Sequence, residues 1–203
     1  MRNKVILIGF CTLFVHQLCA QVGKSTNQVG VSGLPIYDIF NFYPKNEISG
    51  GAISVNYGTF VSNKLCFGVN LFYAAYSNQY DTQAKDLHKQ KQNNDLMGLN
   101  TSLRYYCAIK KNFLVYGVIS IGFGINKFQT TNLSTSLIVA KTHEPIALLM
   151  AGLGINYFIT KNFALELNVP YVFVNRFSYD PYAEHLNSIL PTIGIQYYWP
   201  YKE

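Results

Sequence analysis

Apolar residues alternate with small or polar residues, with a period of two, through most of the chain. Between Met97 and Cys107 the odd positions are mostly large and apolar, whereas the even positions are Gly, Asn, Ser, Arg and Tyr. The same pattern covers residues 115–125. Alternation of this kind is typical of β-strands with two different faces. We therefore predict eight strands, at residues 29–33, 53–59, 67–75, 97–107, 115–125, 149–157, 165–173 and 193–199.

The predicted connections alternate in length. Three are tight and alike, at residues 62–64, 110–112 and 160–162, and four are long and polar, at about 35–50, 78–95, 127–144 and 177–188. We expect residues 79–95 to stay without regular structure, because their Gln, Asn, Lys and Asp side chains bury little apolar area. An even strand number with alternating turn lengths predicts an all-β fold, an eight-stranded antiparallel transmembrane β-barrel. Its short turns would be periplasmic and its long loops extracellular.

A short motif recurs on alternate predicted strands. It consists of a small residue, an aliphatic residue, a polar residue and a tyrosine, and its tyrosines are Tyr57, Tyr105, Tyr157 and Tyr197. Trp199 ends the alternation of the last strand. All four tyrosines fall on the apolar face at equivalent depth, near the rim that holds both termini. Together with Trp199 they predict an aromatic girdle at one membrane interface.

The composition of the two faces decides which one is outside. The polar face is mainly Gly, Ser and Asn, which fit a narrow barrel interior, while the other face is Val, Leu, Ile, Phe and Tyr, as lipid requires. The alternative is a soluble, lipocalin-like carrier with the faces exchanged, whose outer face would be rich in Lys, Glu and Thr. The low charge of the strands favours the membrane orientation.

Two charged residues, Arg104 and Glu166, lie in the middle of predicted strands on the polar face. A charge enclosed in a barrel is normally paired or hydrogen-bonded, because its desolvation is costly. We therefore expect both side chains in an interior polar network, as partners across the barrel. A proton or ion pathway is the alternative, but a barrel of about eight strands is normally filled by side chains.

The N-terminal segment has the order of a secretory signal peptide. Arg2 and Lys4 precede an apolar stretch at residues 5–15, and Ala20 provides a small residue at the exit. We expect residues 1–20 to be the signal peptide and residues 21–203 to be one barrel domain. Leu18 is bulkier than the residue usual at the −3 position, so the cleaved bond stays open. Cys19 as a lipid anchor is disfavoured for the same reason.

Charge and cysteines narrow the functional classes. The net charge of +6 becomes 6 − 2 = +4 without Arg2 and Lys4, and the lysines are scattered through turns and loops. This pattern disfavours nucleic acid as a partner and allows only a diffuse attraction to anionic lipid headgroups.

Cys66 and Cys107 fall on opposite faces of their strands, so we expect them to be unpaired.

Candidate catalytic residues are few. The histidines after the signal segment are His88, His143 and His185, all in predicted loops, and neither metal-ligand spacing nor a cofactor motif accompanies them. Only His185 has acidic residues and a serine nearby. We expect a protein without enzymatic activity, metal or cofactor. A lipid A-modifying enzyme that uses His185 stays an alternative.

The alternating strands, the Cys19-Ala20-Gln21 segment and the closing Gly194–Trp199 strand make the chain resemble small outer-membrane barrels of the OmpA/OmpX type, as found in Bacteroidota. This resemblance implies a monomer in the bacterial outer membrane, in contact with lipids and lipopolysaccharide. It also implies recognition of the last strand by the barrel-insertion machinery, although Pro200–Glu203 follow Trp199 here. The expected role is structural, or interaction with surface partners through the loops. The alternative is an accessory of a secretion or transport complex.

Overall fold

The computed structural model describes residues 24–37, 47–81, 89–110, 112–176 and 186–200. These residues form strands joined by short turns. The strands are β1 (Thr26–Tyr37), β2 (Glu47–Phe60), β3 (Leu65–Asp81), β4 (Lys89–Lys110), β5 (Phe113–Asn132), β6 (Ile138–Phe158), β7 (Phe163–Arg176), β8 (Leu186–Ile189) and β9 (Thr192–Pro200). Within the described ranges, no helix is long and apolar enough to span a membrane. The predicted signal peptide lies outside these ranges.

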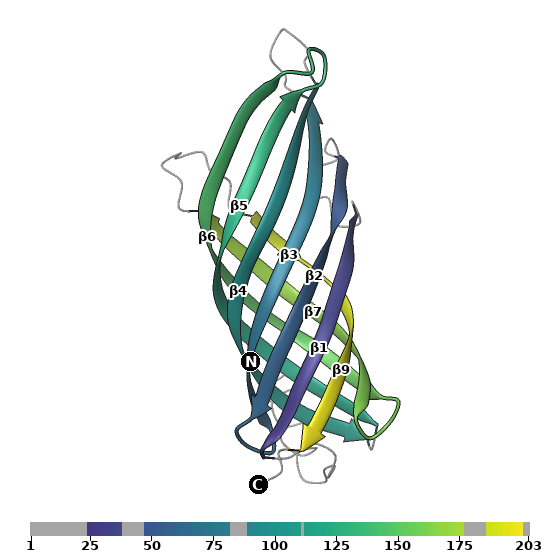
Figure 1. The fold of residues 1–203 in the computed structure, drawn as a ribbon. Helices are drawn as coiled ribbons and strands as arrows, with labels where there is room; N and C mark the ends of the chain where they lie inside the picture. Colours follow the sequence, from purple (N-terminus) through teal and green to yellow (C-terminus); the bar gives the residue numbers. More distant parts are fainter. Residues whose placement is uncertain (1–23, 38–46, 82–88, 111, 177–185, 201–203) are drawn as a thin grey trace, which may run out of the picture.

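The strands close into an antiparallel barrel (Figure 1). Strand β1 closes it by pairing with β2 on one side and with β9 on the other. Strands β8 and β9 both pair with β7 in one continuous register, with Ile189 opposite Tyr171 and Thr192 opposite Asn168. They are therefore one strand of the wall, interrupted between Ile189 and Thr192. The predicted eight-stranded barrel is confirmed.

The three predicted tight turns join β2 to β3, β4 to β5 and β6 to β7. Two of them are closed by a hydroxyl group. Ser62 Oγ accepts a hydrogen bond from the Leu65 amide, and Thr160 Oγ1 accepts one from the Phe163 amide, each at 3.1 Å. Side-chain acceptors of this kind stabilise a tight turn locally. Lys111, in the middle of the second turn, lies outside the described residues.

The strands on one side of the barrel are much longer than predicted. The expectation that residues 79–95 lack regular structure is wrong for most of the segment, because Tyr80 pairs with Gln90 and β3 and β4 form a continuous ladder below that point. Strands β5 and β6 likewise pair through most of residues 127–144. Backbone hydrogen bonds between neighbouring strands order these polar segments without apolar burial. In Figure 1, β4, β5 and β6 rise well above the upper ends of β1 and β7.

Inside and outside are arranged as the alternation predicts. Large apolar side chains cover the outer face; Ile119, Ile121 and Phe123 on β5, for example, are about 60% exposed. Polar residues such as Asn100, Asn156 and Gln196 are buried in the lumen. A soluble carrier would need the reverse arrangement. Lipid is the environment that suits this outer surface.

The height of the apolar band agrees with a bilayer. On β4 the band runs from Tyr105 up to the first exposed charge, Asp95, ten residues away. A strand that rises about 3.4 Å per residue and is tilted by about 40° gains about 2.5 Å of height per residue. The band is therefore about 25 Å tall, as expected for an outer-membrane barrel.

Candidate functional site

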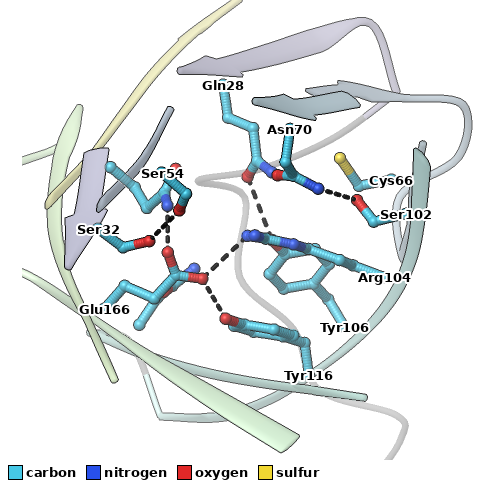
Figure 2. A network of polar contacts seen from close by, with 12 residues as sticks. Gln28, Ser32, Ser54, Cys66, Asn70, Ser102, Arg104, Tyr106, Tyr116 and Glu166 are labelled. Atoms are coloured by element: carbon cyan, nitrogen blue, oxygen red, sulfur yellow. Dashed lines mark hydrogen bonds and ion pairs between the residues drawn. The ribbon is translucent and has the colours of Figure 1, made fainter. Parts of the chain in front are cut away.

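Among the residues that the structure describes, one buried ion pair lies in the lower lumen. Arg104 on β4 and Glu166 on β7 come from opposite parts of the wall, and both are almost completely buried. Arg104 Nη1 donates a hydrogen bond to Glu166 Oε1 at 2.9 Å. Figure 2 shows the two side chains pointing toward each other inside the barrel. The structure thus places both sequence-predicted interior charges in one contact.

Further polar groups surround this pair. The Tyr116 hydroxyl donates to Glu166 Oε1, and Gln196 Nε2 donates to Glu166 Oε2. The guanidinium carbon of Arg104 lies 5.0 Å from the centre of the Tyr116 ring, as in a cation–π contact. Both carboxylate oxygens therefore have partners, which is what a charge removed from water requires.

The barrel register explains how these side chains meet. Glu166 lies opposite Asn156 on β6 and opposite Gly194 on β9, so its neighbours on the same face are small or polar. The Tyr116 ring lies over Gly154 of β6, where a Cβ atom would overlap the ring. A Cβ atom at position 154 would therefore have to displace the tyrosine ring that reaches Glu166.

Aromatic side chains fill the lumen at the turn-side end, below the ion pair. This aromatic floor consists of Phe60, Tyr106, Tyr116, Phe158 and Tyr198. The centres of the Phe60 and Tyr106 rings are 5.0 Å apart, and those of Phe158 and Tyr198 are 5.1 Å apart. The Tyr106 hydroxyl donates to Gln28 Oε1 at 3.1 Å. The floor joins strands from all around the barrel.

A second cluster lies in the upper lumen and is apolar. This apolar belt comprises the buried residues Ile146, Leu148, Val172 and Val174, with Phe72, Leu96, Met150 and Leu190 packed against them and partly exposed. Sequence reasoning missed it. In residues 146–150 and 171–174 both faces of the strand are apolar or aromatic. The alternation that distinguishes the lumen face from the lipid face is therefore absent there.

On the outside, aromatic residues form a row near the turn-side rim. Tyr57, Tyr105, Tyr157 and Tyr197 are each about 40–50% exposed, and Trp199 is partly exposed. Ring contacts link this row to the turns: the Phe113–Tyr157 and Phe163–Tyr197 pairs both have centres 4.8 Å apart. The role of the row as a membrane girdle stays a prediction.

A row of charged residues crosses the outer face at the opposite edge of the apolar band. Asp95 on β4, Lys127 on β5 and His143 on β6 are direct cross-strand neighbours, and all three are exposed. The Tyr73 hydroxyl donates to Asp95 Oδ1 at 3.0 Å. Lys141 is exposed on β6, two residues above His143. We call Asp95, Lys127, Lys141 and His143 the upper charged rim.

The other sequence candidates do not gather into a site. His88 and His185 lie outside the described residues, and His143 belongs to the upper charged rim. Among the residues that the structure describes, His, Cys, Asp and Glu form no group that could hold a metal ion. Cys66 is buried in the lumen and Cys107 is partly exposed, and the structure has both as free thiols.

Several solved structures are similar to this chain. The N-terminal β-barrel domain of Pseudomonas aeruginosa OprF is 13% identical, with 87% of this chain and 99% of that chain covered and a TM-score of 0.43. Ail of Yersinia pestis is 15% identical, with 88% and 99% covered and a TM-score of 0.44. Neisserial surface protein A is 12% identical, with 86% and 97% covered and a TM-score of 0.46.

No curated protein sequence matches this chain. The family model described as the outer membrane protein beta-barrel domain matches residues 8–187, which is most of the chain. The closed barrel, its apolar outer band and its polar lumen agree with that match. This chain therefore belongs to the outer membrane protein beta-barrel domain family and is a protein of the bacterial outer membrane.

Proposed function

We propose that this protein is a non-enzymatic surface-interaction barrel. The observation that carries the proposal is the height of one side of the wall. Strands β3 to β6 stay paired beyond the upper charged rim, for example at Lys91 opposite Thr131 and at Thr130 opposite Ala140. A paired sheet presents its outer side chains on a fixed frame, and rigid scaffolds of this kind commonly carry binding surfaces.

The lower lumen supports a scaffold role. The aromatic floor and the Arg104–Glu166 pair connect strands that are distant in sequence, and they occupy the interior at that level. A barrel of about eight strands has little lumen left once its side chains are placed. We therefore expect partners to bind to the part of the wall that stands above the membrane, and not inside the lower lumen.

The upper charged rim suggests what kind of molecule binds to the barrel. Lys127 and Lys141 are exposed at the upper edge of the apolar band, where the phosphate groups of lipopolysaccharide lie. Ammonium groups bind phosphate through charge-assisted hydrogen bonds. We assign these lysines, with His143, to contacts with lipopolysaccharide phosphates, which would orient the wall above them.

The test compares two pairs of lysines at opposite rims. Lys127→Gln/Lys141→Gln removes charge from the upper rim, and Lys24→Gln/Lys161→Gln removes the same charge from exposed positions at the turn-side rim. Each protein is placed in bilayers with lipopolysaccharide or with its dephosphorylated form, and the temperature of unfolding is read from the gel shift on heating. We expect the phosphate-dependent stabilisation to disappear only in the upper-rim variant.

If both variants lost the phosphate-dependent stabilisation equally, or if neither lost it, the assigned contact between the upper charged rim and phosphate would be wrong. Other outcomes would replace the proposed role itself. Stable co-purification with proteins of a secretion complex would make the barrel an accessory of that complex. Loss of a lipid A modification in the His185→Ala variant would make it an enzyme.

A further inference from the structure

Three buried oxygen atoms on neighbouring strands have no hydrogen-bond partner among the residues that the structure describes. They are Asn94 Oδ1 on β4, Asn126 Oδ1 on β5 and Glu144 Oε2 on β6. Asn94 and Asn126 are each only 3% exposed. Each of the three residues lies an even number of positions from buried lumen residues of its own strand, so all three face the interior. We call Asn94, Asn126 and Glu144 the upper oxygen cluster.

The strand register brings these three residues together. Asn126 lies directly opposite Glu144 in the β5–β6 ladder. In the β4–β5 ladder Asn94 lies opposite Phe128, two residues from Asn126 on the same face, so Asn94 and Asn126 are diagonal neighbours. Directly opposed Cβ atoms are about 5 Å apart and diagonal ones about 7 Å apart. Asn and Glu side chains are long enough to bring their oxygen atoms to one small ligand across such gaps.

The described surroundings do not compensate the charge of Glu144. The lysines of the upper charged rim are close in sequence, but they lie on the outer face. No described side chain makes an ion pair with Glu144, whereas Glu166 in the lower lumen pairs with Arg104. An enclosed carboxylate oxygen without a counter-charge or a hydrogen bond is costly. The cluster therefore favours a ligand that brings positive charge.

The nature of the three atoms indicates which kind of ligand this is. Glu166 receives hydrogen bonds from a guanidinium, a hydroxyl and an amide group. In the upper oxygen cluster, by contrast, the three unpartnered atoms are two amide oxygens and one carboxylate oxygen. Amide and carboxylate oxygens are the ligands that hard cations such as Ca²⁺ prefer. Ca²⁺ also accepts irregular geometry and water as further ligands.

The cluster lies where an ion can arrive from the extracellular side. Asn94 and Asn126 each precede a residue of the upper charged rim in the sequence. Glu144 as a residue is only partly buried, although its Oε2 atom is enclosed. The apolar belt begins below it, at Ile146. A hydrated ion would therefore reach the cluster from above without crossing the belt.

We propose that the upper oxygen cluster binds one Ca²⁺ ion. Glu144 is the charged ligand, Asn94 and Asn126 are neutral ligands, and water completes the coordination shell. The ion would tie β4, β5 and β6 together at the base of the tall side of the wall. The site does not depend on the proposed lipopolysaccharide contact, because its ligands face the lumen. It departs from the expectation of a protein without metal, which rested on the spacing of histidines and cysteines.

Calcium binding by the unmodified barrel is the first test. The protein is reconstituted in phosphatidylcholine nanodiscs without lipopolysaccharide, and equilibrium dialysis against radioactive calcium measures the stoichiometry. We expect one ion per barrel with a Kd of about 10⁻⁴–10⁻³ M, the range of extracellular calcium modules. Absence of saturable binding in this range would overturn the proposal and would leave the lipopolysaccharide contact untouched.

A matched pair of variants locates the ion. Glu144→Gln removes a carboxylate from the lumen, and Asp95→Asn removes one from the outer face, next to Asn94 in the sequence. We expect Glu144→Gln to weaken binding about tenfold or more, because the charge of the ligands sets the affinity of a calcium site. Asp95→Asn should leave the Kd unchanged. Unchanged affinity in Glu144→Gln, or an equal loss in both variants, would exclude the cluster as the site.

An added carboxylate separates an ion site from a simple hydrogen bond between Asn126 and Glu144. Asn126→Asp places two carboxylates directly opposite each other, which destabilises a strand pair. We expect this variant to unfold at a lower temperature than the unmodified protein when Ca²⁺ is chelated. With Ca²⁺ present it should regain that stability and bind the ion more tightly. A loss of stability that Ca²⁺ does not reverse, or that sodium chloride of equal ionic strength reverses as well, would overturn the proposal.

Discussion

Arg104 Nη1 and Glu166 Oε1 lie 2.9 Å apart in the lumen and join β4 to β7 across the barrel. Both side chains are removed from water, so each depends on the other for charge compensation. This dependence makes the contact sensitive to loss of one partner and much less sensitive to loss of both.

Removal of one partner should be costly. We expect Arg104→Met or Glu166→Leu to lower the free energy of unfolding by about 3–5 kcal/mol, because an uncompensated charge stays buried. The double variant should be less destabilised than the sum of the two single variants. Urea unfolding in bilayers, followed on gels, measures all three. Additive losses would show that the two side chains do not interact.

The packing of Tyr116 over Gly154 gives a second prediction. A Cβ atom at position 154 would overlap the ring, so Gly154→Ala should destabilise the barrel by about 1–3 kcal/mol. Gly117→Ala, on the neighbouring strand β5, is the matched control, because a Cβ atom there meets nothing within 4 Å. Equal stability of the two variants in the same unfolding assay would contradict the described packing.

The apolar band predicts how the cost of a charge depends on depth. Ile121 on β5 is 58% exposed within the band, whereas Gln129 lies on the same face of the strand above the upper charged rim. Ile121→Arg should cost about 2–4 kcal/mol, and Gln129→Arg about 0–1 kcal/mol. Unfolding free energies in bilayers test the difference. Similar values at both depths would place the membrane boundary elsewhere on the wall.

Trp199 offers a test of the girdle prediction, because it is the only tryptophan in the chain. If the aromatic row lies at the membrane interface, lipids brominated close to the carbonyl end of the acyl chain should quench its fluorescence most strongly. Lipids brominated near the chain terminus should quench it weakly. The opposite order would place Trp199 near the bilayer centre and exclude an interfacial girdle.

Alternation along the chain was sufficient to predict the eight strands of the wall, the three tight turns and the face on which Arg104 and Glu166 lie. The wall is amphipathic where it crosses the membrane, and there the period of two is visible. It was not sufficient above the membrane. Both faces of residues 89–95 are polar, so a paired strand and a loop have the same composition there.

Other features depend on contacts between strands that are far apart in sequence. The position of Tyr116 over Gly154 follows from the register of β5 against β6, which no local pattern encodes. The ladder between β1 and β9 ends at Gly33 and Ile193, two residues short of Pro35 and Pro191, and these two prolines are separated by most of the chain. The interior side chains are polar or aromatic at the bottom and apolar above, and alternation alone predicts only that they face inward.

The unequal height of the described strands also makes the two sides of the barrel different at the cell surface. On one side, β4, β5 and β6 form a paired sheet that rises above the outer leaflet. On the other side, the described parts of β1 and β7 end lower (Figure 1). A bulky molecule that moves along the cell surface would meet a tall paired sheet on one side and no described strand at that height on the other. The barrel would then have a front and a back.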